Sequence, residues 1–103
     1  MVTKVLGQVN PAAATNTTAY TVPTGKVAIF NVSFCNMSAT PIAVRLAICA
    51  NGTPTAAEYL EYEATVPQFG VLERSGLVAQ EGKNIVVQAT TAAASVSVFG
   101  YEE

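Results

Sequence analysis

Apolar and polar residues alternate along most of this chain with a period of two. In residues 42–49 every even position is aliphatic, and in residues 27–36 the side chains of Phe30, Val32 and Phe34 recur at the same spacing. Successive side chains of a strand point to opposite faces, so this period is typical of strands that bury one face. Both segments are therefore expected to be strands with one face in a core.

Turn residues divide the chain into about eight such segments. The expected strands are residues 3–9, 20–22, 27–36, 42–49, 59–66, 70–78, 84–90 and 95–101, with residues 12–18 as a loop or an extended arm. No segment predicts a helix of useful length. This spacing predicts an all-β fold, an antiparallel β-sandwich of jelly-roll type. With 103 residues, one domain is expected over residues 1–103, in which residues 1–19 form an extended N-terminal strand or arm.

The two strongest strand segments are expected to pair with each other as a hairpin. Alignment of their apolar faces places Phe34 opposite Val44 and Phe30 opposite Ile48. In that register Cys35 and Cys49 lie about 20 Å apart along the strands. A disulfide needs Cα atoms within about 7 Å of each other. Two free thiols are therefore expected.

Composition narrows the possible functions. Half of the residues are apolar, only 12% are charged, and the net charge is −2, whereas about 25% of residues in an average protein are charged. The exposed faces must then consist mainly of threonine, alanine, serine, asparagine and glutamine. Such a surface protects a free monomer poorly against association. Such a surface composition is expected of a protein that is a permanent part of an assembly.

The charge distribution argues against nucleic acid and membranes as partners. The five cations are scattered along the chain: Lys4, Lys26, Arg45, Arg74 and Lys83. Nucleic-acid affinity depends on clustered cations that neutralise phosphates, and no such cluster is present. There is also no basic amphipathic segment and no run of about 20 apolar residues. The N-terminus lacks the apolar region of a signal peptide, so synthesis and assembly in a cytoplasm are expected.

The residue types that perform most catalysis are missing. The chain has no histidine and no aspartate, so its serines lack a general base, and a metal site would have to rely on glutamates alone. Glu61 and Glu63 are expected on one strand face about 7 Å apart. They form either an acid–base pair or, in the favoured interpretation, a solvated acidic face. We expect no enzyme and no catalytic residue, cofactor or metal.

The same alternation places several apolar side chains away from the core. In residues 95–101, Val96 and Val98 should face inward, so Phe99 and Tyr101 face outward. The N-terminal segment is more apolar than a solvated tail needs to be. Apolar side chains on an otherwise polar face often mark interfaces, although they also cover sandwich ends within one subunit. The expected partner contacts are Val5, Leu6, Val9, Tyr59, Phe99 and Tyr101.

Four motifs, spread over most of the chain, carry a family resemblance. They are Leu6-Gly7-Gln8 with Pro11, the segment at residues 20–26, Cys35-Asn36, and Val98-Phe99-Gly100. In these motifs the chain resembles small β-sandwich virion proteins of tailed bacteriophages, especially phages that infect cyanobacteria. It departs from the family pattern in the glutamate-rich residues 58–63. The resemblance implies a structural role and no catalytic residues.

The resemblance and the surface composition together predict a virion structural protein, assembled in the host cytoplasm. The expected function is that of a capsid cement or decoration protein. Its expected partners are copies of itself, as a homo-oligomer, and the major capsid protein, with residues 2–10 as the first candidate for exchange between subunits. The alternative is a tail, head-fibre or baseplate component, including one that binds a receptor or a glycan. The absence of tryptophan counts against a sugar site.

Overall fold

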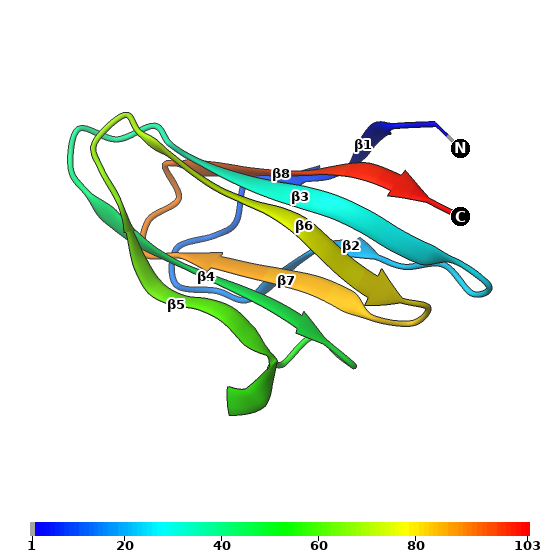
Figure 1. Cartoon of the computed structure of the whole chain (residues 1–103). Coiled ribbons are helices and arrows are strands. Elements are labelled where there is room, and N and C mark those ends of the chain that lie inside the picture. The colour runs from blue at the N-terminus through cyan, green and yellow to red at the C-terminus, as the bar shows by residue number, and fades with distance from the viewer. Residues whose placement is uncertain (1) are drawn as a thin grey trace.

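The computed structural model describes residues 2–103, which form two four-stranded antiparallel sheets (Figure 1). Sheet A has the strand order β1-β8-β3-β6, and sheet B has the order β2-β7-β4-β5. The strands are β1 Lys4–Val9, β2 Thr17–Thr21, β3 Val27–Asn36, β4 Ile42–Cys49, β5 Tyr59–Val66, β6 Val71–Gln80, β7 Asn84–Ala89 and β8 Ala94–Glu102. A short 3-10 turn, η1 (Ala56–Glu58), precedes β5.

The expected all-β sandwich is confirmed, and its connectivity is that of a jelly roll. β4 and β5 follow each other in the chain and pair in sheet B. The other consecutive strands of residues 2–103 lie in opposite sheets. As a result β8, at the C-terminal end, lies between β1 and β3 in sheet A (Figure 1).

The inner faces of the two sheets form the core. Phe30, Phe34, Leu46 and Ile85 are the largest fully buried side chains. Val96 and Val98 are also buried, as the pattern of the last strand predicted. Each fully buried side chain of this size contributes about 1.5–3 kcal/mol relative to an exposed one. This apolar layer is therefore the main attraction between the sheets.

The expected hairpin between residues 27–36 and 42–49 is wrong. β3 lies in sheet A, where Phe34 pairs with Val96 and Leu72, and β4 lies in sheet B, where Val44 pairs with Ala64 and Ala89. Alternation identifies the buried face of a strand but not the strand beside it. The two apolar faces meet across the core instead of side by side in one sheet.

The N-terminal part of the chain contributes an edge strand to each sheet. β1 pairs with β8, and β2 pairs with β7. Thr17 and Thr18, which were expected in a loop or an extended arm, already pair with Val87 and Val86 in β2. Residue 1, the start of the expected arm, lies outside the described residues.

Two polar pairs bridge the sheets at opposite sides of the sandwich. On one side the Tyr20 hydroxyl of β2 donates a hydrogen bond to the Glu102 carboxylate of β8. Burial, with this hydrogen bond and the negative charge of Glu102, raises the pKa of Tyr20, so the phenol stays a donor. On the other side, Arg74 of β6 forms an ion pair with Glu61 of β5. The polar pairs thus close the two open flanks of the core.

The expected common face of Glu61 and Glu63 is also wrong. Glu61 lies opposite the core residue Leu46, whereas Glu63 has φ 56° and lies in the irregular part of the β4–β5 ladder. The extra residue of a bulge reverses the alternation of a strand. Glu63 therefore pairs with Arg45 on the outer face of sheet B, and Glu61 pairs with Arg74 between the sheets.

All four edge strands carry a register irregularity. It occurs in the pairs β1–β8, β2–β7, β3–β6 and β4–β5. The central pairs β3–β8 and β4–β7 run without one. Bulges interrupt the hydrogen-bond ladder and twist an edge away from a second chain. The edges are thus protected against the addition of another strand.

The expectation of two free thiols is confirmed. The two cysteines lie in different sheets, Cys35 on β3 and Cys49 on β4, rather than at distant points of one hairpin. Cys35 is half-buried, and Cys49 is fully buried with its Sγ donating to the carbonyl of Asn51. Burial raises the pKa of the Cys49 thiol, and the nearby charge of Glu58 acts in the same direction.

We expect iodoacetamide to modify Cys35 much faster than Cys49 in the native protein at neutral pH. The thiolate is the reactive species, and the raised pKa and burial leave Cys49 protonated and covered. Because its pKa is raised, the Cys49 reaction should accelerate at a higher pH than that of an exposed thiol. Mass spectrometry over time measures both rates, and in urea the two should become similar. Equal rates in the native protein would contradict the burial of Cys49.

Candidate functional site

Apolar side chains gather on the outer face of sheet A. We call this group the sheet-A patch; its members are Val5, Val27, Ile29, Val78, Phe99 and Tyr101. Strand pairing places Val5 opposite Phe99 and places Ile29 between Tyr101 and Val78. The patch therefore crosses all four strands of the sheet. Val5, Val27 and Val78 are 55%, 41% and 59% exposed, and the other three are half-buried.

Polar groups border the sheet-A patch on its own face, among them the charged Glu103, whose backbone pairs with that of Val27 just beyond β8. Asn31 lies beside Phe99, and Gln80 lies opposite Val27. Glu73 is on the same outer face but lies opposite Ser33, on the other side of the irregular segment of β6. An apolar centre with aromatic residues and few charges is the composition of protein–protein interface cores. This face is suited to contact another protein.

The structure brings together only half of the predicted partner contacts. Val5, Phe99 and Tyr101 belong to the sheet-A patch. Leu6 and Val9 pack against the core of their own chain. Tyr59 lies on sheet B, paired with Ala47. Local alternation could not assign the residues of β1 to faces, because β1 contains a register shift between Val5 and Gly7.

The sequence prediction missed Val27 and Val78 as members of the patch. Val78 is flanked by two buried residues, Leu77 and Ala79. All three residues are apolar, so the sequence pattern does not show which of them faces outward. Val78 is also distant in sequence from the other residues of the sheet-A patch, so the sequence did not indicate that it belongs to the patch. The pairing of Val78 with Ile29 brings it to the patch.

The outer face of sheet B has a different character. Ala47, Cys49 and Val86 point away from the main core and are nevertheless fully buried. Ala47 lies between Val86 and Tyr59 in the sheet. Residues 50–58, which contain η1, connect β4 to β5 below this sheet in Figure 1. This face therefore has a small covered region of its own.

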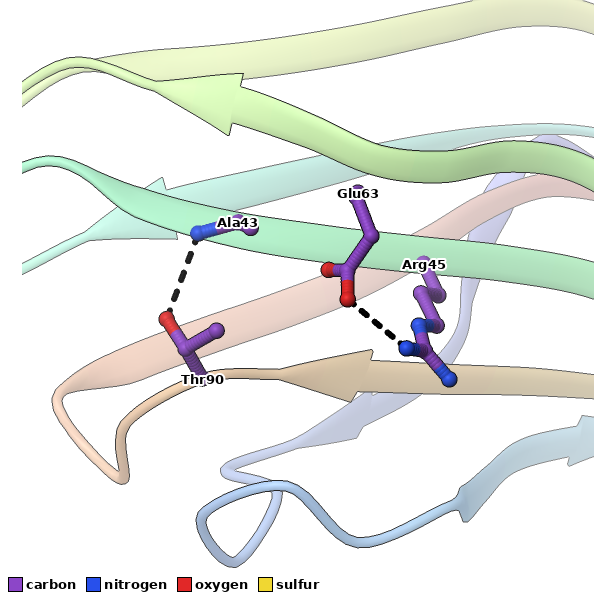
Figure 2. Close-up of polar contacts among 4 residues, drawn as sticks. All are labelled: Ala43, Arg45, Glu63 and Thr90. Atoms are coloured by element: carbon purple, nitrogen blue, oxygen red, sulfur yellow. Dashed lines mark hydrogen bonds and ion pairs between the residues drawn. The ribbon is translucent and has the colours of Figure 1, made fainter.

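An aromatic and charged cluster lies beside this region. Figure 2 shows Arg45 and Glu63 pointing toward each other, with 2.7 Å between Arg45 Nη2 and Glu63 Oε1. The guanidinium carbon of Arg45 lies 4.3 Å from the centre of the Tyr62 ring, a cation–π contact. Tyr62 meets Tyr59 edge to face, with ring centres 5.0 Å apart and an interplanar angle of 85°. We call Arg45, Tyr59, Tyr62 and Glu63 the tyrosine cluster.

Hydrogen bonds anchor both ends of the strand region around the cluster. At one end of β4, the Ala43 N–H donates to the Thr90 hydroxyl at 3.2 Å (Figure 2). At the other end, the Glu58 carboxylate accepts from the N–H groups of Thr55 and Ala50 at 2.9 and 3.2 Å. These bonds, that from Thr55 above all, lower the pKa of Glu58. Glu58 is therefore charged at neutral pH, and it ties the two ends of the connection at residues 50–58 to each other.

A pocket of about 420 Å³ opens beside the tyrosine cluster, lined by Ala56, Tyr59 and Tyr62. Small-molecule sites typically have volumes of about 300–1,000 Å³. The hydrogen bond to Glu63 raises the pKa of Arg45, so the guanidinium stays charged. Its charge is balanced by Glu63, and the pocket lining consists of one alanine and two tyrosines, which are largely apolar side chains with a phenol hydroxyl on each tyrosine. The pocket is thus suited to a small neutral ligand.

Three exposed apolar side chains, Met37, Phe69 and Val71, form a smaller group at one end of the sandwich. The Phe69 N–H donates to the Ser38 carbonyl, and Val71 pairs with Cys35. Phe69 is 68% exposed and has φ 52°, a conformation that bulky residues rarely adopt. We call this group the loop-end cluster; it lies on the connections β3–β4 and β5–β6 and on the first residue of β6.

Searches for other kinds of site found little. Within residues 2–103 no three side chains of histidine, cysteine, aspartate or glutamate are grouped to hold a metal ion. None of the described helical segments has the length and hydropathy to cross a membrane. Comparison of the chain with models of protein families, with curated proteins and with solved structures finds no match.

Proposed function

We propose that this protein is a structural component of a bacteriophage virion, a capsid cement or decoration protein. It associates with copies of itself and with the major capsid protein. The sheet-A patch is the observation that carries the proposal, because it is an apolar surface built from all four strands of one sheet. The jelly-roll architecture also occurs in viral capsid proteins, which supports the proposal by analogy.

Association through a face agrees with two further features of the chain. The bulges in all four edge strands disfavour pairing of a partner strand with an edge. The low charge of the chain, 12% of residues, leaves little repulsion between copies. The partner therefore meets a flat side-chain surface, and its apolar contact area supplies most of the affinity.

Val78→Glu should abolish association through the sheet-A patch. The substitution places a carboxylate inside an apolar contact, opposite Ile29. Burial of an unpaired charge costs several kcal/mol, so the dissociation constant should rise by about a hundredfold or more. Light scattering on size-exclusion fractions over a range of concentrations measures the effect on self-association.

Val71→Glu is the matched control. Val71 and Val78 lie on the same strand and the same face, and both are 59% exposed. The control should self-associate like the unaltered protein. If Val71→Glu disrupts association and Val78→Glu does not, the loop-end cluster is the interface and the sheet-A patch is not. A wild-type protein that stays monomeric and ignores virus particles would refute the proposed function.

Copy number separates the two structural roles. Quantitative mass spectrometry of purified particles should find the chain in hundreds of copies if it decorates the capsid. A handful of copies would instead assign it to the tail, a head fibre or the baseplate.

A further inference from the structure

We infer that the pocket beside the tyrosine cluster is a carbohydrate site that takes a neutral pyranose ring. This inference is independent of the proposed function, because the pocket lies on sheet B and the sheet-A patch lies on the opposite face of the sandwich.

The two tyrosines supply the apolar walls. Their rings are nearly perpendicular, at 85°, so one ring forms a wall beside the other. Arg45 covers one face of the Tyr62 ring, yet Tyr62 remains 59% exposed, so its other face is open to solvent. The electron-rich face of an aromatic ring attracts the polarised C–H groups that line one side of a pyranose. Ala56 completes the lining without adding a polar group.

The charges of the cluster select against ionic ligands. A phosphate or carboxylate ligand would compete with Glu63, which already binds Arg45 at 2.7 Å. A quaternary ammonium ligand would compete with Arg45, which already occupies one face of Tyr62. The positive charge of Arg45 would also repel such a ligand. A ligand with apolar faces and neutral hydroxyl groups meets neither conflict.

The lining residues carry polar groups that match the hydroxyl groups of a sugar. Tyr59 and Tyr62 line the pocket, and each has a hydroxyl that can donate one hydrogen bond and accept others. Arg45 is not part of the lining and lies on the covered face of Tyr62, so the phenol hydroxyls supply the side-chain hydrogen bonds to the ligand.

The test is a titration of the isotope-labelled full chain, followed by amide chemical shifts. The probes are methyl α-glucopyranoside, methyl α-mannopyranoside and methyl β-galactopyranoside, each raised to tens of millimolar, with choline chloride and sodium phosphate as ionic comparisons. At least one sugar should shift the amides of Ala56, Tyr59 and Tyr62 in a saturable way, with a dissociation constant in the millimolar range. The ionic probes should leave these amides unchanged.

Three variants decide whether the shifts come from this pocket. Tyr62→Ala should weaken sugar binding by roughly tenfold or more, because it removes an aromatic wall. Tyr62→Phe keeps the wall and should lose much less, which separates stacking from a general loss of structure. Phe69→Ala removes another exposed aromatic ring, that of the loop-end cluster, and should bind like the unaltered protein.

Several results would overturn the inference. No shift with any of the three sugars, or shifts that persist in Tyr62→Ala, would show that the pocket is not a sugar site. Saturable shifts with choline alone would make it a cation site, and shifts with phosphate alone would make it an anion site. Self-association of Tyr62→Ala should be normal, so failure of the sugar site and failure of the sheet-A interface are distinguishable.

Discussion

Gly100→Ala is expected to destabilise the fold by more than about 3 kcal/mol, because it forces a methyl group into the backbone of the neighbouring strand. A Cβ atom at this position would lie 2.2 Å from the Ile29 carbonyl oxygen and 2.7 Å from the Phe30 Cα. Side-chain rotation cannot relieve such a contact, so β8 and β3 must move apart. β8 is a central strand, and this displacement would reach both β1 and β3.

Gly52→Ala is the control for this substitution. No atom lies within 4 Å of the position that its Cβ would take, so the change should alter stability by less than about 0.5 kcal/mol. Thermal melts followed by circular dichroism compare the two variants. For a domain of this size, 1 kcal/mol corresponds to about 4–8 °C in Tm. If the Gly100→Ala protein has the same Tm as the wild type, β8 and β3 are not closely packed at this point.

Asn36→Ala is expected to cost about 3 kcal/mol, because it leaves several buried polar groups without partners. Asn36 is 1% exposed and is the buried polar side chain of the core region. Its Nδ2 donates to the carbonyls of Thr40, Val66 and Pro67, at 2.9, 3.2 and 3.0 Å. Its Oδ1 accepts from the N–H and the hydroxyl of Ser38, both at 2.9 Å.

These bonds hold the connections β3–β4 and β5–β6 together, so their loss should also free the loop-end cluster. Urea titration measures the cost, and amide exchange should show faster opening at residues 37–41 and 66–70. Asn36→Asp should destabilise at least as much, because it turns a carboxylate toward three carbonyl oxygens. Asn16→Ala, at an exposed position, should change stability by less than about 0.5 kcal/mol. Equal stability of Asn36→Ala and Asn16→Ala would disprove the role assigned to Asn36.

Part of the candidate site followed from sequence alone and part of it did not. The outward direction of Phe99 and Tyr101 followed from their alternation with Val96 and Val98, which are buried. The tyrosine cluster did not follow, because it depends on the bulge at Glu63, where the alternation of β5 changes. A regular strand, with a period of two residues throughout, would place Glu61 and Glu63 on the same face. Bulges depend on the partner strand as well as on the local sequence, so the local pattern could not reveal this one.

The two-residue pattern by itself determined the fold class, the number of strands in the described chain, and the buried face of the best-patterned strands. Those properties are local, because they depend on which side of its own strand each side chain faces. Tertiary structure alone decided which strands are neighbours, and therefore which outward side chains share a surface. Val5 meets Phe99, and Ile29 meets Val78, only because the chain crosses between the sheets at nearly every connection. Strand pairing joins residues that are distant in sequence. The free energy that favours one pairing over another comes from contacts throughout the core, so no local segment contains it.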